Sequence, residues 1–339
     1  MERLSILRNA RRQARRGSSS LWHDALRYLV RQRSAIVGLA ILGSMVVMAI
    51  FAPLIAPFDP VVPMLELPTE TQWGSMCAAG LRVAQIATDR PALEIKRISV
   101  RMTPCIHLLG CSPCRPQHIL GLDSNTRDLF SRVVYGSRYS LYIGFAAVGF
   151  AIVIGSLLGA VAAYAGGWTD NIIMRIMDVL MAFPSLMLAI AIVSVLGPGL
   201  VNALLAIGIV SIPAYARVMR ASVLSVKERD FVTADRALGF SAPAILFRRI
   251  LPNSLAPMIV QGTLGIATAI LDAAALSFLG LGAQKPMPEW GIMLGDERSY
   301  VFTAPHLVFF PGLAIMLTVL AFNLLGDGLR DALDPRLNR

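Results

Sequence analysis

The stretch SLYIGFAAVGFAIVIGSLLGAVAAY, residues 140–164, contains no charged residue. A helix rises about 1.5 Å per residue, so about 20 apolar residues cross the hydrocarbon core of a bilayer, which is roughly 30 Å thick. The stretch is long enough, and its apolar residues run almost continuously rather than along one stripe as in an amphipathic helix. It therefore predicts a helix that spans a membrane.

Five other stretches share this length and apolar character. They are residues 35–55, 172–196, 200–218, 254–275 and 307–325. Hydrophobic residues make up 55% of the chain and charged residues 15%, whereas soluble domains carry about 25% charged residues. So little charge cannot coat a soluble globule of 339 residues. We therefore predict an all-α polytopic membrane protein with six transmembrane helices.

Basic residues set the predicted orientation. Residues 1–34 contain nine Arg against Glu2 and Asp24, which makes this segment too long and too basic for a cleaved secretory leader. Residues 217–249 contain seven Lys and Arg against three acids. Because cytoplasmic segments are enriched in Lys and Arg, we expect both stretches in the cytoplasm. The run 11–16 also fits a twin-arginine signal, which we rank second to a solvated anchor beside the membrane.

Six spans return the chain to its starting side, so we predict a multi-pass protein of the cell (plasma or inner) membrane with both termini cytoplasmic. The expected divisions are a basic segment 1–34, a first helix 35–55, an extracytoplasmic loop 56–138, a five-helix core 139–326 and a tail 327–339. The long external loop contains an insert at about 61–116, and the core contains a cytoplasmic loop at about 219–252.

The charge balance excludes two function classes. The 31 Lys and Arg against 21 Asp and Glu give a formal charge of +10, but cytoplasmic basic segments account for it, and we expect no nucleic-acid partner. The only lysines are Lys96, Lys227 and Lys285, and none follows a glycine. The sequence therefore lacks the Gly-Lys-Ser/Thr loop that binds nucleotide phosphates. Any ATP-driven work must be done by another subunit.

The cytoplasmic loop has the pattern of helix, glycine turn, helix. Residues 226–238 are good helix formers, Gly239 ends or bends that helix, and Ser241 with Pro243 can start another. Ala234 and Ala237 are small, which suits close packing against a second surface. The residues alone leave two interpretations open: an amphipathic connector lying at the membrane, or an element that docks on a partner.

The same loop resembles a known family motif. Residues 230–239, DFVTADRALG, followed by Ile250-Leu251-Pro252-Asn253, are similar to the EAA loop of ABC-importer permeases, the coupling helix that sits in a groove of the ATP-binding subunit. Gly239 and Leu251-Pro252 match the motif. Thr233 occupies the family's Glu position and Asp235 its second Ala position, so these two residues depart from it.

The resemblance extends over residues 33–60 and from Gln117 to the end. The matching stretches are residues 118–123, 127–132, 135–136, 182–185, 275–282, 288–291 and 323–336. On these motifs the chain is identified as a member of the C-type permease family of dipeptide, oligopeptide and nickel ABC importers. Between Pro60 and Gln117 it does not follow the family.

The resemblance implies a type I ABC-importer permease fold with a long external loop after the first helix. It implies a B-type permease as partner, two ATP-binding subunits that hold the ATP and Mg, and an extracytoplasmic substrate-binding protein that delivers cargo. This chain would bind no cofactor and catalyse no reaction, and cargo would move by alternating access. The implied coupling residues are Asp230, Thr233, Ala234, Asp235, Ala237, Gly239, Leu251 and Pro252.

Charged and irregular positions in or near the spans are candidates for a cavity or gate. Arg175 and Asp178 lie three residues apart on one helical face and can pair. Asp272 fits either a translocation cavity or an interhelical hydrogen bond. Glu289 and Trp290 fit an outer gate or a partner contact better than an active site. Pro184, like Pro213 and Pro257, interrupts a predicted span, where it can bend the helix or line a cavity.

All four cysteines fall in the external insert. They are Cys77, Cys105, Cys111 and Cys114. An oxidising exterior favours disulfides, but a metal or iron–sulfur site and no defined role stay open, and four cysteines allow three pairings. We assign no metal ligands. The competing function classes are a secondary transporter that works alone, for which we see neither inverted repeats nor several charges within the membrane, and a membrane-anchored scaffold.

Overall fold

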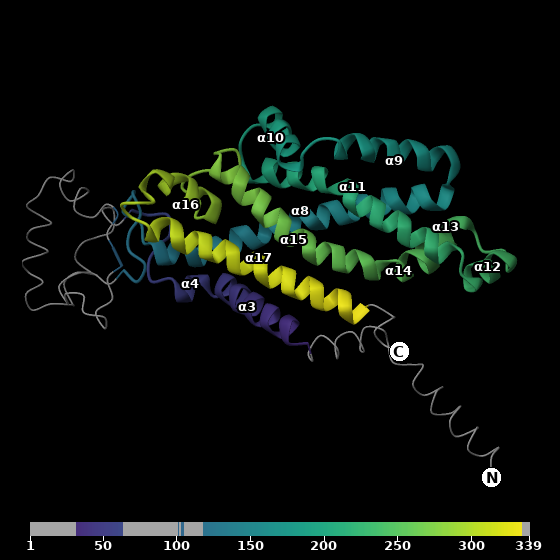
Figure 1. The fold of residues 1–339 in the computed structure, drawn as a ribbon, viewed down its shortest axis with the longest axis horizontal. Coiled ribbons are helices and arrows are strands. Elements are labelled where there is room, and N and C mark those ends of the chain that lie inside the picture. The colour runs from purple at the N-terminus through teal and green to yellow at the C-terminus, as the bar shows by residue number, and fades with distance from the viewer. Residues whose placement is uncertain (1–31, 64–100, 102, 105–117, 334–339) are drawn as a thin grey trace, which may run out of the picture.

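The computed structural model describes residues 32–63, 101, 103–104 and 118–333. Within them the chain forms an elongated bundle of helices without β-strands (Figure 1). The elements are α3 (Arg33–Ile50), α4 (Ala52–Ile55), α8 (Leu129–Ala165), α9 (Gly167–Met181), α10 (Ser185–Leu196), α11 (Leu200–Lys227), α12 (Asp230–Ala237), α13 (Ala242–Ile245), the π-helix η3 (Leu246–Ile250), α14 (Leu251–Asn253), α15 (Leu255–Phe278), α16 (Trp290–Glu297), the 3-10 helix η4 (Arg298–Tyr300) and α17 (His306–Leu333).

Five of the described helices are long and apolar enough to cross a membrane on their own: α3, α8, α11, α15 and α17. The third predicted span differs, because α9 and α10 meet at an angle of 92°. The predicted span over residues 172–196 is thus two helices, and the break falls at Pro184, where the sequence predicts an interruption. The described part of the chain has six spans only if this bent pair counts as one.

Proline explains where the third span breaks. Pro184 directly precedes α10 and has a ψ of 130°, outside the helical region. It lacks a backbone N–H, and its ring disfavours helical geometry at the preceding Phe183. Pro213 and Pro257, by contrast, lie inside the unbroken helices α11 and α15. Pro257 is in the first turn of α15, where a missing N–H costs little.

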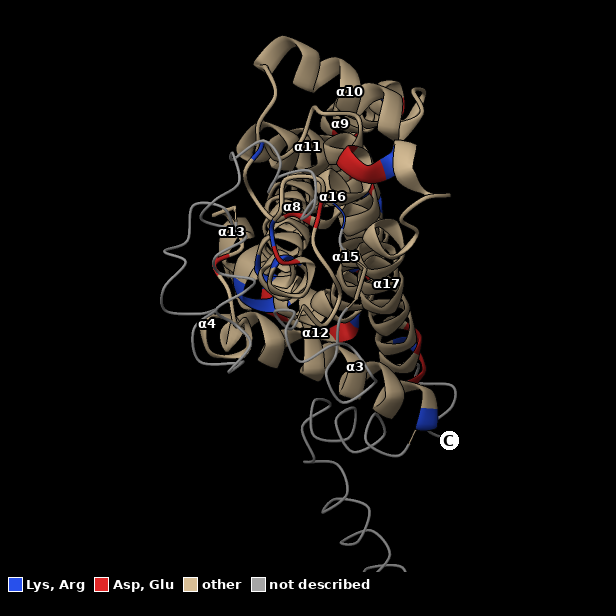
Figure 2. Ribbon diagram, turned by 90° about the vertical axis from the view of Figure 1, so that its left-hand side faces the viewer, with Lys and Arg blue, Asp and Glu red and all other residues tan. Residues whose placement is uncertain are grey.

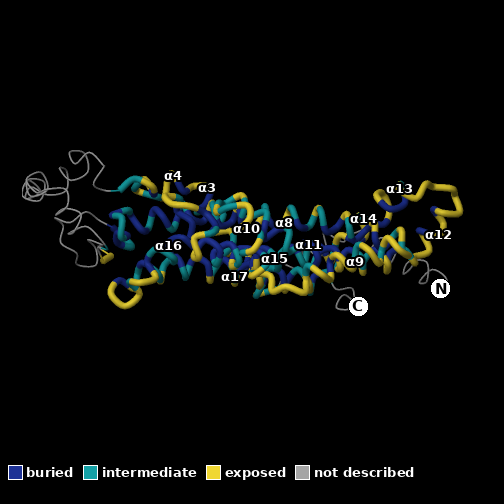
Figure 3. Tube along the Cα trace, turned by 90° about the horizontal axis from the view of Figure 1, so that it is seen from above, coloured by how far each residue is buried: buried dark blue, intermediate teal, exposed yellow. Residues whose placement is uncertain are grey.

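The centre of the bundle is the crossing of α8 and α11, where small residues let the two backbones approach closely. A Cβ added at Gly159 would lie only 2.2 Å from the carbonyl oxygen of Ala216. Ala216 itself is completely buried. Buried residues continue along the axis of the bundle, whereas exposed residues mark its surface and the α12–α13 end (Figure 3).

The beginning of α3 and the end of α17 lie side by side. The Gln32 side-chain amide donates a 2.8 Å hydrogen bond to the Asp331 carboxylate, and Ala35 packs with Ala332. Both helix ends point toward the end of the bundle that carries α12 and α13, which project beyond them, while α4 and α16 are at the opposite end (Figures 1 and 3). We call these the α12 end and the α16 end.

The α8–α11 contact makes a prediction about stability. Gly159→Ala should lower the melting temperature of the purified protein in detergent, because the new methyl group collides with backbone and overpacking costs about 1–3 kcal/mol. Gly149→Ala is the matched control, since a Cβ there meets nothing within 4 Å and Ala favours a helix over Gly by about 0.5–1 kcal/mol. Equal melting temperatures for the two variants would contradict this packing.

Candidate coupling surface and outer cap

The segment between α11 and α15 begins at a residue that is hydrogen-bonded to α8. The Lys227 ammonium, at the last residue of α11, donates to the carbonyls of Ala163 and Tyr164 at 3.3 and 3.0 Å. These carbonyls are at the C-terminal end of α8, where a cation is favoured by the helix dipole. The chain then breaks at Glu228 and Arg229 before α12. The predicted helix over 226–238 is therefore divided between two elements.

The end of α12 is a glycine-terminated turn, as predicted. Gly239 has a φ of +80°, a conformation that glycine adopts without strain. Its N–H donates to the Arg236 carbonyl at 3.0 Å, and the N–H of Phe240 donates to the Asp235 carbonyl at 3.2 Å. This pair of hydrogen bonds is the Schellman motif. The next helix, α13, follows Ser241 and has a proline in its first turn, which confirms the helix–turn–helix prediction.

Most motif residues of α12 are at the surface. Thr233, Ala234, Ala237 and Gly239 are exposed, and so are two large apolar side chains beside them. Leu238 is 75% exposed and Phe240 50% exposed. Sequence analysis missed these two residues, although their positions on either side of Gly239 gave a signal. Apolar side chains exposed beyond the spanning helices mark a surface for a protein partner.

Asp235 points the other way. It is buried, and its Oδ2 lies 3.2 Å from Nε of Arg249 in η3. The residue that departs from the family motif is thus paired within its own chain. The π-helical turn η3 comes just before Pro252, which cannot donate the N–H that a regular helix would offer to the Arg248 carbonyl. Pro252 is exposed and Leu251 is partly buried.

Two ion pairs join α9 to α11. Arg217 pairs with Asp178, and Arg220 pairs with Asp170 through two hydrogen bonds. The expected pairing of Asp178 with Arg175 on its own helix is therefore wrong. The packing of α9 against α11 brings a better-placed guanidinium to this carboxylate than the neighbouring turn does.

A second polar assembly closes the α16 end. Arg132, at the start of α8, is buried with its Nε 3.5 Å from the Asp123 carboxylate. Its Nη1 donates to the carbonyls of Pro60 and Pro286, at 2.8 and 3.3 Å. Burial raises the pKa of Asp123, and the Arg132 charge opposes this. Figure 2 looks along the bundle from this end and shows the charged residues as short segments on a mainly uncharged ribbon.

Glu289 caps α16, and Trp290 connects α16 to α8 by a hydrogen bond. The Glu289 carboxylate accepts from the N–H groups of Gly291 and Ile292 at 2.9 and 3.0 Å and so caps α16. The Trp290 indole donates to the Val133 carbonyl at 3.0 Å. Glu289 is 1% exposed and Trp290 is completely buried. A partner contact through these side chains is therefore wrong, because neither reaches the surface.

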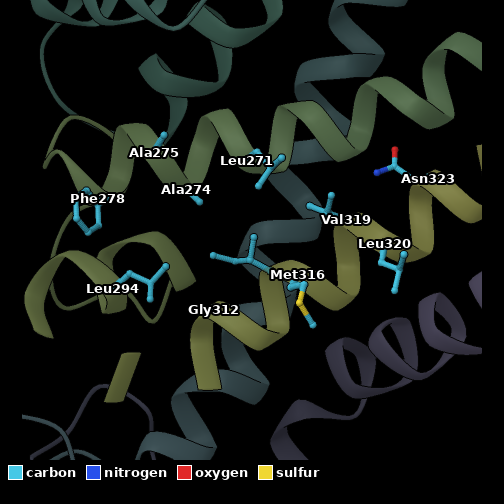
Figure 4. Close-up of a pocket in the computed structure, with 11 residues that line it drawn as sticks. Leu271, Ala274, Ala275, Phe278, Leu294, Gly312, Met316, Val319, Leu320 and Asn323 are labelled. Atoms are coloured by element: carbon cyan, nitrogen blue, oxygen red, sulfur yellow. The ribbon is translucent and has the colours of Figure 1, made fainter. Parts of the chain in front are cut away.

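An apolar groove of about 710 Å³ lies between α15 and α17, with α16 at one end (Figure 4). Leu271, Phe278 and Met316 are among the side chains that line it, and Asn323 is its one polar side chain. It offers no charge to a polar cargo. The gate candidates Pro184 and Asp272 lie elsewhere: Pro184 is exposed at the α9–α10 bend, and Asp272 is partly exposed on α15.

Comparison with protein families identifies this arrangement. A family model described as binding-protein-dependent transport system inner membrane component matches residues 128–339, more than half of the chain. The chain belongs to this family. A second model, the N-terminal TM domain of oligopeptide transport permease C, matches residues 20–73 of the permease. The predicted membership among ABC-importer permeases is confirmed.

Several curated proteins are similar to this permease. The dipeptide transport system permease protein DppC of Alkalihalophilus pseudofirmus is 46% identical over 318 residues, which cover 94% of this chain and 91% of that protein. DppC of Haemophilus influenzae is 41% identical over 92% of this chain and 94% of its own length. The glutathione transport system permease protein GsiD of Pectobacterium atrosepticum is 53% identical over 65% of this chain and 73% of its own length.

A solved structure shows the same fold. A chain of the inward-facing MetNI methionine ABC transporter superposes with a TM-score of 0.50 at 19% identity, covering 59% of the permease and 96% of that chain. The predicted type I importer permease fold is therefore confirmed. The candidate disulfide cysteines Cys77, Cys105, Cys111 and Cys114 lie outside the described residues.

The buried cap of α16 makes a pH prediction. Burial raises the pKa of Glu289, although two backbone N–H groups oppose this. The folded state then binds more protons than the unfolded state between the ordinary and the raised pKa, so stability should fall as pH rises through this window. Glu289→Gln should flatten the pH dependence of the melting temperature. The same substitution at the exposed Glu228 is the control, and an unchanged slope in Glu289→Gln would contradict the effect.

Proposed function

We propose that this permease is the membrane subunit of an ATP-driven, binding-protein-dependent importer of dipeptides and related short peptides. The observation that carries the proposal is the exposed surface of α12, with Gly239 at its turn and Leu238 and Phe240 beside it. A membrane subunit without a nucleotide site needs such a surface to receive work from an ATPase. The relatives named for dipeptide and glutathione transport favour peptide cargo over nickel.

The proposed assembly contains a second, B-type permease, two ATP-binding subunits that hold ATP and Mg, and an extracytoplasmic binding protein. Lipid surrounds the spans. The bent pair α9 and α10 supports the second permease as a partner, because it exposes large apolar side chains. Trp168, Met187 and Val195 are 82%, 67% and 86% exposed. An exposed apolar surface of this kind must be covered by lipid or by another protein.

The proposed location is the cell membrane, with both termini and α12 in the cytoplasm. Two observations support it. The start of α3 and the end of α17 lie together and point toward the α12 end, and segment 1–34 is rich in Arg. Under the positive-inside rule this end faces the cytoplasm. The α16 end then faces the binding protein.

The proposed mechanism is alternating access. ATP can shift a two-state equilibrium only by as much as its binding favours one state over the other, so the ATPases must hold α12 differently in their two states. From α12 the motion passes through the Asp235–Arg249 pair to η3, and from there through α14 to α15. A π-helical turn on this route is a place where a helix can change its winding.

Gly239 provides the direct test of this function. Gly239→Glu should leave the assembled transporter in the membrane but abolish most ATP-dependent dipeptide uptake into vesicles, because a charged side chain would project from the docking surface. Gly280→Glu is the matched control, since Gly280 has the same φ of +80° and likewise meets nothing within 4 Å, but lies beyond α15 at the other end of the bundle.

Both variants carry equal backbone strain. A difference in uptake between them is therefore due to the change at the docking surface and not to strain in the glycine turn. Normal uptake by assembled Gly239→Glu transporter, or uptake by the permease without any ATPase, would refute the proposed function.

The Asp235–Arg249 pair should transmit motion rather than add much stability. Asp235→Ala should change the melting temperature little, because its partner is half exposed and such pairs contribute about 0.2–1 kcal/mol. Arg249→Ala should lower it more, because it leaves the buried Asp235 carboxylate unpaired. Each variant should raise the ATP hydrolysed per peptide transported. Exchanging the two charges should restore part of the coupling. Arg248→Ala is the control, since Arg248 is exposed and forms no ion pair among the described residues. Additive effects in the double variant would contradict the pairing.

A further inference from the structure

One face of α15 is polar where a lipid-facing helix would be apolar. Gln261, Thr268 and Asp272 are separated by seven and four residues, so they share one side of the helix. Thr268 is exposed, and Gln261 and Asp272 are partly exposed. The opposite side is packed into the bundle through residues such as Gly262, Ile266 and Ala273. We call Gln261, Thr268 and Asp272 the polar stripe of α15.

The spanning helix α3 shows the contrast. Apart from Arg33 at its first residue, its exposed large side chains are apolar, as lipid contact requires. They are Ile36, Val37, Leu39, Val47 and Ile50. Its one exposed hydroxyl, Ser44, donates to the Ile41 carbonyl of its own helix. An ionisable side chain inside the bilayer is costly and almost always faces a water-filled cavity or a polar partner. The polar stripe therefore does not face lipid.

The stripe extends to the middle of the span. Thr268 is ten residues before the end of α15, which places it about 15 Å below that end at 1.5 Å per residue, and Asp272 about 9 Å below it. A neighbouring polar group comes from α11, because the Tyr215 hydroxyl lies where a Cβ of Gly265 would be. The Thr268 hydroxyl donates to the Gly265 carbonyl at 2.9 Å, which directs its lone pairs away from the helix.

Asp272 has no partner within the described chain. No hydrogen bond or ion pair involves its carboxylate among residues 32–63 and 118–333. Two acids of α9 differ in this respect, since Asp170 and Asp178 are each paired with an arginine. A carboxylate kept partly open at this depth is available to a cation that arrives from outside the chain.

We propose that the polar stripe of α15 lines the transport path and that the Asp272 carboxylate forms a weak transient site for the ammonium group of the cargo. The identity of the cargo as a short peptide rests on the proposed function. An ammonium group donates hydrogen bonds, and an ionised carboxylate accepts them as charge-assisted bonds. One partly hydrated carboxylate binds weakly, as a site on a path must if cargo is to leave it.

Water access and charge at the stripe can be measured directly on the complete transporter. With the four native cysteines replaced by serine, Thr268→Cys is treated with water-soluble methanethiosulfonates that carry a positive or a negative charge. We expect the cationic reagent to react several-fold faster, and Asp272→Asn to abolish this preference. Gln261→Cys, about three turns from Asp272, is a second reporter that should react without a charge preference. Leu271→Cys is the control on the apolar groove and should stay unlabelled.

A second experiment, with cargo present, distinguishes a stripe that lines the transport path from one that contacts another subunit. A dipeptide with a free amino group should slow cationic labelling of Thr268→Cys, whereas the same dipeptide with an acetylated amino group should not. Unreactive reporters, equal rates for both reagents, or a preference that survives Asp272→Asn would overturn the proposal. A charge preference without protection by the free dipeptide would overturn the assignment to cargo.

Labelling needs neither ATP nor transport, so these outcomes are independent of the proposed function. If ATP-dependent uptake fails but the stripe is labelled with the expected charge preference, the importer mechanism is refuted and the proposed polar site is retained. If uptake is normal but the stripe does not react with the reagents, the proposed site is refuted and the importer function is retained.

Discussion

The bilayer imposes the constraint on which the rest of this structure depends: no backbone polar group and few charges can be left unpaired in hydrocarbon. Long helices satisfy the backbone, and small residues let them pack, as Gly159 does against Ala216. Buried polar side chains concentrate at the α16 end, where Arg132 ties Asp123 to the loops around Pro60 and Pro286. An ionisable group left without a partner near the middle of a span is therefore informative, because a charge there is costly.

The segment between α11 and α15 faces a different demand under the proposed function, which is to pass motion between a soluble partner and a membrane helix. Lys227 anchors the end of α11 to the end of α8, so α12 starts from a fixed point. Asp235 and Arg249 then connect α12 to the π-helical turn ahead of α15. Because α15 also carries Asp272, the element that a partner would move is the element that carries the polar stripe.

Local rules predicted some features of this site and not others. Gly239 as the end of α12 follows from its freedom to adopt positive φ, and the position of Pro184 marks the break in the third span. The angle of that break depends on how α10 packs on α11. The partner of Asp178 could not be predicted either, because Arg175 and Arg217 are equally plausible until the packing of α9 against α11 is known.

The sequence by itself determined that this chain crosses a membrane several times, that it lacks a phosphate-binding loop, and which short segment resembles the coupling motif of its family. Apolar run length, lysine positions and motif spacing are all local properties. Only the tertiary structure decided which way side chains face. It buried Glu289 and Trp290 and turned Asp235 toward Arg249. The physical reason is that burial and ion pairing depend on residues far apart in the chain, which only packing brings together.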